Sequence, residues 1–253
     1  MGQERIIHAA LLGAGTVGSG VYKLVKDLEE EIISKTGARL VVDKILVRDT
    51  TKAREGIPSE LLIDRWDEIL NDPQIEIVIE VMGGIRPALT WLEEALRAGK
   101  QVVTANKDLL AEYGEQLFDA AEAGKCDLHF EAAVAGAIPI IRPLRQSLAA
   151  SELTEVMGIV NGTTNYILTR MTEDGMGYEE ALALATKLGY AESDPTADVE
   201  GYDAGRKVAI MASIAFNSNV TFSQVYTEGI THITAEDIRY AKEFGCLLYT
   251  SPS

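Results

Sequence analysis

Two lysines occupy positions from which an ammonium group could stabilise or protonate a reacting oxygen. Lys107 follows a strand-like run directly, and Lys207 comes four residues after Asp203 in a helical pattern. An ammonium group can stabilise or protonate an oxygen on which negative charge develops while a hydride reaches the neighbouring carbon. We therefore treat Lys107, Lys207 and Asp203 as candidate catalytic residues.

The spacing alone leaves structural alternatives open. Asp203 and Lys207 share one helix face, where an exposed ion pair would stabilise the helix by only about 0.2–0.5 kcal/mol, and spacing by itself favours that interpretation. Gly201 and Gly205 weaken it, because glycines are costly in a helix and indicate close approach by another group. A solvated Lys107 at a helix start is disfavoured by the positive end of the helix dipole.

A glycine-rich sequence lies between an apolar strand-like run and a helical pattern. Gly13, Gly15 and Gly18 allow a tight turn, close approach to a pyrophosphate and an N-terminal helix end aimed at its charge. Thr16 and Val17 complete this loop. In this context the sequence predicts a dinucleotide site, and a purely structural glycine turn is the alternative.

The ends of two further strands bear on the choice of cofactor. Arg48 and Asp49 follow the second strand, where an arginine suits the 2′-phosphate of NADP and an acid suits the ribose of NAD. We favour NADP through Arg48, with NAD or a solvated arginine as alternatives. Thr104 and Lys107 follow another strand, and the carboxyl ends of parallel strands face the cofactor crevice.

The elements that must position these residues alternate between strand-like and helical patterns. This alternation is typical of an α/β fold with a doubly wound, Rossmann-type parallel sheet. We expect a nucleotide-binding domain over residues 1–137 and an α+β substrate domain over 138–245. Strands are predicted at 6–12, 40–47, 75–81, 101–104 and 127–130, with helices ending near 35, 98 and 123; the second domain is predicted to have helices at 140–149, 179–188 and 203–216 and a strand at 153–160.

Composition excludes several classes of function. The 253 residues include 23 Lys and Arg against 39 Asp and Glu, and the net charge of -16 disfavours nucleic acid and anionic lipid as partners. No apolar run approaches the roughly 20 residues of a membrane span, and Cys126 and Cys246 cannot form a disulfide framework. We expect a cytoplasmic protein. His8, His129 and His232 are scattered without metal-ligand spacing and are interpreted as structural.

Taken together, five segments resemble the homoserine dehydrogenase family. They are residues 13–18, 103–107, 131–139, 158–165 and 189–207, and the resemblance runs from residue 6 to about 244. It implies an enzyme that reversibly reduces L-aspartate 4-semialdehyde to L-homoserine with NADPH or NADH, in the biosynthesis of threonine, methionine and isoleucine. The alternatives are another two-domain dehydrogenase for an amino acid or a sugar, and an inactive protein that binds NADP without turnover.

The resemblance also implies roles for individual residues. Lys107 and Lys207 would flank the reacting oxygen, with Lys207 as the leading proton donor and Asp203 orienting it. The amino-acid end of the substrate would be bound by Gly162, Thr163, Tyr190, Glu192 and Asp198. A monovalent cation, usually sodium in this family, would be held by Glu131, Val134, Gly136 and Ile138.

The last eight residues do not resemble the family. Relatives continue after residue 245 with further strands and a helix, whereas residues 246–253 match none of these elements. We expect a C-terminally truncated chain whose aberrant tail, 246–253, lies outside the packed fold. A homodimer is expected only of a chain with the complete C-terminus.

Overall fold

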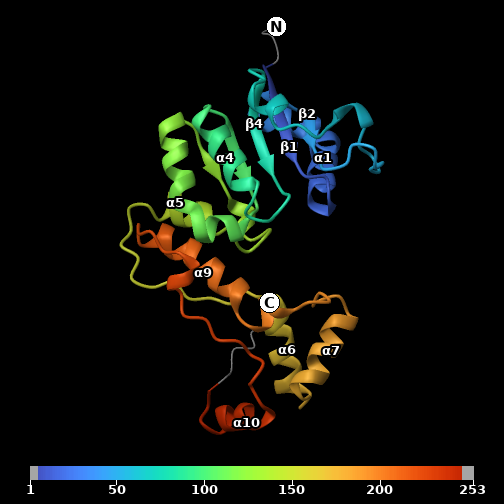
Figure 1. Ribbon diagram of the computed structural model, residues 1–253. Helices are drawn as coiled ribbons and strands as arrows, with labels where there is room; N and C mark the ends of the chain where they lie inside the picture. Colours follow the sequence, from blue (N-terminus) through green and yellow to red (C-terminus); the bar gives the residue numbers. More distant parts are fainter. Residues whose placement is uncertain (1–4, 247–253) are drawn as a thin grey trace. The chain divides into compact units, whose positions relative to one another are not determined.

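The structure is a computed structural model that describes residues 5–246, and its chain divides into two compact units, Met1–Gln146 and Ser147–Ser253 (Figure 1). The predicted tail, apart from Cys246, lies outside the described residues.

The first unit is built on a parallel sheet with the strand order β3-β2-β1-β4-β5-β6. The chain moves outward from β1 to β3 on one side and from β4 to β6 on the other, so its direction reverses between β1 and β4. The elements are β1 (Arg5–Leu12), α1 (Thr16–Asp27), α2 (Glu29–Thr36), β2 (Ala38–Leu46), η1 (Ser59–Leu61), β3 (Leu62–Ile63), α3 (Asp67–Leu70), β4 (Ile75–Glu80), α4 (Ala88–Arg97), β5 (Gln101–Thr104), α5 (Lys107–Gly124), β6 (Leu128–His129), η2 (Glu131–Ala133) and the π-helical turn η3 (Pro143–Ser147).

Burial on both faces of the sheet explains the composition of its strands. Leu11 and Leu12 of β1 are fully buried, as expected of a central parallel strand covered by helices on both sides. In α4, Leu89, Leu92 and Leu96 are buried at the spacing of one helix face. This apolar core fixes the sheet whose carboxyl edge carries the candidate cofactor residues.

The strands and helices predicted for this unit are confirmed, with two differences. The helix expected to end near residue 35 is two helices, because Leu28 leaves helical geometry at φ −106° and ψ 21°. The strand β3 was not predicted. It is two residues long and pairs with Ile45 and Leu46, and no hydrophobic periodicity can be recognised in two residues.

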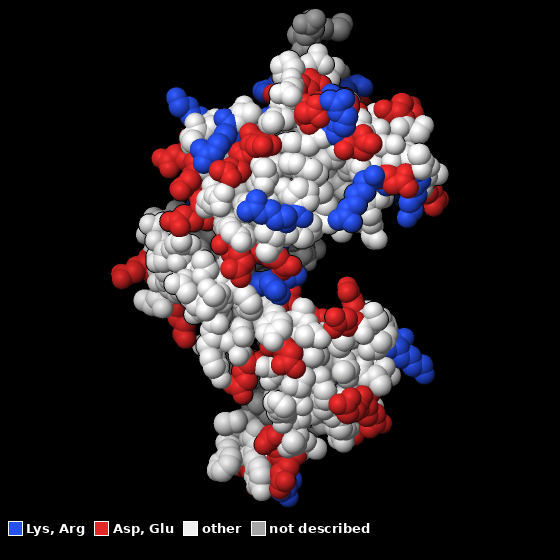
Figure 2. All heavy atoms as spheres, in the orientation of Figure 1, with Lys and Arg blue, Asp and Glu red and all other residues white. Residues whose placement is uncertain are grey.

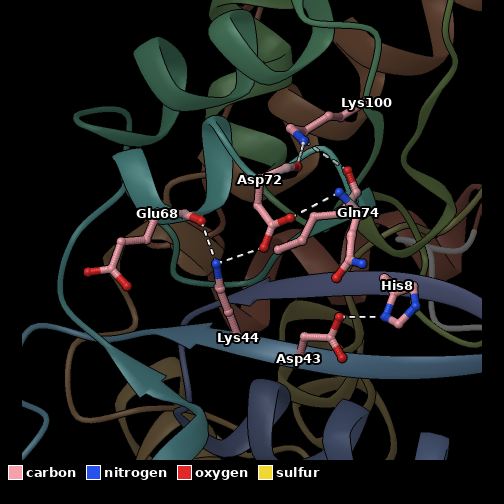
Figure 3. A network of polar contacts seen from close by, with 8 residues as sticks. His8, Asp43, Lys44, Glu68, Asp72, Gln74 and Lys100 are labelled. Atoms are coloured by element: carbon pink, nitrogen blue, oxygen red, sulfur yellow. Dashed lines mark hydrogen bonds and ion pairs between the residues drawn. The ribbon is translucent and has the colours of Figure 1, made fainter.

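A polar network lies at the amino ends of β4 and β5 (Figure 3). In this parallel sheet the glycine loop follows the carboxyl end of β1, at the opposite edge. Lys44 Nζ donates to Asp72 Oδ2 (2.8 Å) and to the Glu68 carbonyl (2.7 Å). Lys100 Nζ donates to the Asp72 and Ile75 carbonyls at 2.7 and 2.8 Å. Burial lowers the pKa of Lys100, and the hydrogen bond from Lys44 lowers that of Asp72. The network fixes the turn that leads into β4.

In its described residues, the second unit is helical. Its core contains Ile167 and Met171 of α6, Ala181 and Ala185 of α7, and Ile238 of α10. Alanines on α7 let that helix pack closely against α6. The elements are α6 (Gly162–Glu173), α7 (Tyr178–Lys187), α8 (Thr196–Val199), α9 (Tyr202–Ala215), η4 (Phe222–Gln224) and α10 (Ala235–Glu243).

Two predictions for the region after residue 137 are wrong. Residues 153–160 have no strand assignment, and Val156 and Ile159 are 39% and 43% exposed. An apolar, β-branched sequence becomes a strand only when a neighbour satisfies its backbone groups, and no strand lies beyond His129 within residues 5–246. The helix predicted at 140–149 is shorter, consisting mainly of η3.

Candidate functional site

The glycine loop has the geometry of a phosphate cradle. Gly13 adopts φ 99°, and its N–H donates to the Leu46 carbonyl at 3.0 Å. A Cβ on Gly18 would lie 2.1 Å from the Gly13 carbonyl oxygen, so only glycine fits there. A Cβ on Gly15 would meet no atom within 4 Å, which leaves open space at the start of α1. Thr16 and Val17 are exposed beside this opening.

The side chains of Arg48 and Asp49 differ in the hydrogen bonds that they make. Asp49 Oδ1 accepts hydrogen bonds from the Thr51 hydroxyl (2.6 Å) and N–H (2.9 Å), which lower the pKa of the carboxyl group. The Arg48 side chain is exposed and makes no hydrogen bond or ion pair with any residue in the described part of the chain. The Arg48 guanidinium is thus available to a ligand, whereas the Asp49 carboxylate is hydrogen-bonded within a local turn.

The segment from Thr104 to Lys107 is tied to the end of β4. The Thr104 hydroxyl is 1% exposed and donates to Glu80 Oε2 at 2.6 Å, so it points into the protein and not toward solvent. Asn106 caps α5 by accepting a hydrogen bond from Leu109 N–H at 3.2 Å. Lys107 is the first residue of α5 and is partly exposed.

Asp203 and Lys207 form an ion pair in α9, in which Asp203 is buried and Lys207 is largely enclosed. Lys207 Nζ lies 2.5 Å from Asp203 Oδ2 and donates to the Val160 carbonyl at 2.5 Å. The side chains of Lys207 and Asp203 are 16% and 8% exposed, so the interpretation as an exposed helix-stabilising pair is wrong. An ammonium group held between two oxygens is fixed in position and keeps one further N–H bond for a ligand.

Asn161 links this pair to a second acid. Its Nδ2 donates to Asp198 Oδ1 (2.7 Å) and Asp203 Oδ2 (3.0 Å), while its Oδ1 accepts from Thr164 N–H (2.8 Å). The amide thus lies between two carboxylates that would otherwise repel each other. Asn161 lies in the segment 158–165 that carries the family resemblance, and an asparagine directly before a helix is also a recognisable N-cap.

The close approach indicated by Gly201 and Gly205 occurs within the unit itself. A Cβ on Gly205 would lie 2.4 Å from Thr227 Cγ2, and Gly201 has φ 79° with its Cβ position 3.0 Å from the Glu228 carbonyl oxygen. These glycines therefore accommodate the segment 222–228.

The residues predicted for the substrate lie mostly around the start of α6. Gly162 is the first residue of that helix, and Thr163 Oγ1 donates to the Tyr190 carbonyl at 2.8 Å. The Tyr190 ring stacks on Tyr166 with centroids 4.6 Å apart. Glu192 is exposed and forms no hydrogen bond or ion pair within residues 5–246. The structure thus brings Thr163 to Tyr190 and Asp198 to Asp203, with Glu192 facing solvent.

The predicted cation residues occupy a strained loop in the first unit. Ala135 and Ala137 adopt φ 49° and 68°, which are unfavourable for residues other than glycine and are typical of functional loops. Val134 is buried, whereas Gly136 and Ile138 are exposed. In the described part of the chain, no group of three or more His, Cys, Asp or Glu side chains is arranged to hold a metal.

The Glu131 carboxylate accepts three backbone hydrogen bonds. Ile140 and Ile141 donate to Oε1 at 2.7 and 3.0 Å, and Arg142 donates to Oε2 at 2.9 Å. Burial raises the pKa of Glu131, but the three backbone N–H groups outweigh this effect and lower it below the usual 4.5. The carboxylate therefore stays charged and keeps one lone-pair position on Oε2 for a cation.

Glu131→Gln should remove stability that depends on pH. A lowered pKa means that the carboxylate stabilises the fold above the unfolded value of 4.5 and that this stability is lost as the pH falls through the folded pKa. We expect the difference in free energy of unfolding between wild type and variant to be largest near neutrality and to shrink in acid. Urea denaturation above and below this window measures it. Glu122→Gln, on an exposed helix position, is the control; a pH-independent difference would contradict the prediction.

The strand order, the turn at Gly13 and the helix that begins beside it define a Rossmann-type, dinucleotide-binding α/β fold. Two family models identify it further. One described as "Homoserine dehydrogenase, NAD binding domain" matches residues 13–131, and one described as "Homoserine dehydrogenase" matches residues 139–250. The chain belongs to the homoserine dehydrogenase family. The second match runs past residue 245, where the sequence analysis began the tail.

Similar proteins cover nearly the whole chain. The homoserine dehydrogenase of Bacillus subtilis is 47% identical over 95% of this chain and 56% of its own length. That of Mycobacterium tuberculosis is 51% identical over 98% of this chain and 56% of its own length. A solved homoserine dehydrogenase from Thiobacillus denitrificans, 44% identical, superposes with a TM-score of 0.88 over 95% of this chain and 56% of that chain. The chain thus spans about half the length of these relatives.

Charge and helix composition add two observations. On the face drawn in Figure 2, the described Lys and Arg side chains of the first unit are interspersed with Asp and Glu. Within residues 5–246, no helix combines the length and the apolar character that crossing a membrane requires.

Proposed function

We propose that this chain carries the reaction of a homoserine dehydrogenase, the reversible conversion of L-aspartate 4-semialdehyde to L-homoserine with a nicotinamide cofactor. The ion pair of Lys207 and Asp203 is the observation that carries the proposal. A largely enclosed lysine beside a buried carboxylate can give a proton to an alkoxide and take it back in the reverse direction. By the family resemblance, Lys107 serves the same oxygen.

Each of these groups has a separate role in the proposed reaction. When bound, the nicotinamide supplies or accepts the hydride. Lys207 holds a proton at Nζ for the carbonyl oxygen of the aldehyde, and Asp203 keeps that ammonium group oriented toward it. Lys107 adds a second positive charge where the oxygen becomes negative.

NADP is the cofactor that we propose, bound at the loop of Gly13, Gly15, Thr16, Val17 and Gly18. The open space at Gly15 and the exclusion of any Cβ at Gly18 fit a dinucleotide. An unengaged guanidinium at Arg48 can bind a 2′-phosphate bidentately, whereas Asp49 is already engaged by Thr51. NAD use remains the alternative.

The amino-acid end of the substrate requires acids for its ammonium group and amide or hydroxyl donors for its carboxylate. We assign Glu192 and Asp198 to the ammonium group. The N-terminal amides of α6 at Gly162 and Thr163 suit the carboxylate, because the positive end of a helix favours an anion. Tyr190, stacked on Tyr166, would form the adjoining wall.

A monovalent cation, sodium in the first instance, would be held by Glu131 and by the backbone carbonyls of Val134, Gly136 and Ile138. The free lone-pair position of Glu131 and the strained loop around Ala135 support this assignment. Bound there, the cation would supply local positive charge and loop rigidity.

Three broader assignments rest on the family and remain proposals. Residues 1–137 would bind the cofactor and 138–245 the substrate. The place of the reaction in amino-acid biosynthesis supports a cytoplasmic location, and a homodimer is the assembly we expect of the full-length protein.

The direct test is an assay of the purified chain for homoserine-dependent reduction of NADP⁺, followed by absorbance. L-Serine, which is one methylene shorter, is the matched control substrate. We expect turnover with homoserine and little with serine. NADPH binding without turnover would favour a cofactor-binding protein over the enzyme, and turnover of another hydroxy acid or sugar would point to the other dehydrogenases.

Glu192→Ala should raise the KM for homoserine while leaving kcat nearly unchanged. Losing an ionic contact to the ammonium group weakens ground-state and transition-state binding alike, and the expected increase is about tenfold. Steady-state kinetics with varied homoserine measures the change. Glu180→Ala, on an exposed position of α7, is the control; an unchanged KM for Glu192→Ala would remove the residue from the substrate site.

A further inference from the structure

A buried carboxylate, that of Glu80, ends β4 beside the cofactor loop. Glu80 is fully buried, its Oε1 accepts from Met82 N–H (2.8 Å) and Gly83 N–H (3.1 Å), and its Oε2 accepts from the Thr104 hydroxyl (2.6 Å). Burying a carboxylate is costly unless donors satisfy it, and an apolar residue would fill a strand end at lower cost. We therefore interpret the Glu80 carboxylate as a group that holds two segments together, the turn after β4 and the end of β5.

Thr104 and Asn106 extend the connection from β4 to α5. Thr104 Oγ1 accepts from Asn106 N–H at 3.0 Å while donating to Glu80. Asn106 Nδ2 donates to the Gly84 carbonyl at 2.7 Å, and its Oδ1 caps the helix that begins at Lys107. The hydrogen bonds thus form a closed loop that includes the turn after β4 and the residue preceding Lys107.

The same turn also contacts the glycine loop. A Cβ on Gly13 would lie 3.1 Å from Met82 Cα, so the Met82 backbone packs directly against the loop that would hold the pyrophosphate. Met82 is in turn held by Glu80 through its N–H. One carboxylate therefore fixes both the backbone beside the glycine loop and the start of α5.

We propose that Glu80 is a positioning residue for the bound cofactor: through Thr104 and Asn106 it holds Lys107 in place, and through Met82 it holds the glycine loop. This inference rests on the proposed function for the role of Lys107, and it gives Thr104 an indirect part in cofactor binding. Thr104 is a predicted cofactor-binding residue, and its hydroxyl is directed toward Glu80.

The directions of the hydrogen bonds determine which substitutions are informative. In Glu80→Gln, the new amide N–H faces either the Thr104 hydroxyl or the N–H groups of Met82 and Gly83. If the amide N–H faces Thr104, the Thr104 hydroxyl hydrogen loses its acceptor. If it faces Met82 and Gly83, their N–H groups meet another donor in place of an acceptor. Thr104→Val removes the hydroxyl while keeping the shape, and Thr104→Ser keeps the hydroxyl.

The experiment compares Glu80→Gln, Thr104→Val and Thr104→Ser with Lys100→Met in the full chain. Lys100 is a matched control because it is 7% exposed and hydrogen-bonded at the opposite end of the same two strands (Figure 3). NADPH affinity is measured by fluorescence titration, kcat and KM by homoserine oxidation, and the opening of residues 105–109 by hydrogen exchange.

We expect Glu80→Gln and Thr104→Val to weaken NADPH binding and lower kcat by about ten- to hundredfold, because small displacements of positioned groups are costly. Exchange at 105–109 should become faster, the homoserine KM should change little, and Thr104→Ser should restore most of the affinity. Lys100→Met should lower thermal stability and leave NADPH affinity intact.

Two results would overturn the inference: equal loss of NADPH affinity in Lys100→Met and Glu80→Gln at comparable stability, or unchanged affinity in Glu80→Gln. If wild type binds NADPH but does not oxidise homoserine, the proposed function fails, while the NADPH titrations still decide the role of Glu80.

Discussion

Lys207→Ala is expected to lower turnover by a factor of about 10²–10⁴, the range for loss of a general acid or base. The alanine leaves Asp203 buried without its ammonium partner and removes the only group that we assign to proton transfer. NADPH affinity should change little, because the cofactor loop belongs to the first unit. Steady-state kinetics and a fluorescence titration with NADPH separate the two effects.

A lysine with similar contacts but no proposed role provides the control. Lys242 also donates to a backbone carbonyl, that of Thr172 at 2.7 Å, within the same unit. Lys242→Ala should therefore retain nearly normal turnover. Near-normal turnover of Lys207→Ala would reject its role, and a loss rescued by Lys207→Arg would assign the residue to charge stabilisation, because an arginine does not release its proton.

Arg48→Ala is expected to weaken NADPH binding by about ten- to hundredfold and to leave NADH binding nearly unchanged. A charge-assisted, bidentate contact with a phosphate has this order of magnitude. The Arg48 guanidinium is exposed in the described structure, so its removal should leave the fold intact. Parallel titrations of the variant with both cofactors give the change in preference.

Arg65 is the matched control for this substitution. It is an exposed arginine of the same unit whose guanidinium pairs with Asp67. Arg65→Ala should affect neither cofactor. Equal losses of NADPH and NADH affinity in Arg48→Ala would reject the contact with the 2′-phosphate, and a loss confined to NADH would favour Asp49 and NAD.

Local sequence was sufficient to predict the nucleotide-binding fold and its glycine loop. The strands β1, β2 and β4 of the first unit contain runs of apolar residues, and helices between them have one apolar face, so short-range patterns identify both. Gly13 and Gly18 could be assigned because their backbone conformation and close packing exclude other residues. Such signals fail for β3, which is too short, and for 153–160, where strand formation depends on a partner that sequence does not name.

The chemistry of the candidate site was only partly predictable for the same reason. Residue types and family resemblance identified Asp203, Lys207 and Arg48, and spacing alone favoured an exposed ion pair for the first two. Tertiary packing decided that this pair is largely enclosed, that Asn161 bridges Asp198 and Asp203, and that Glu80 joins two strand ends. Burial and hydrogen-bond direction arise when segments distant in sequence meet, whereas periodicity and glycine placement act over a few residues. The elements and the candidate residues could therefore be predicted, whereas the pairing of the polar groups depended on packing.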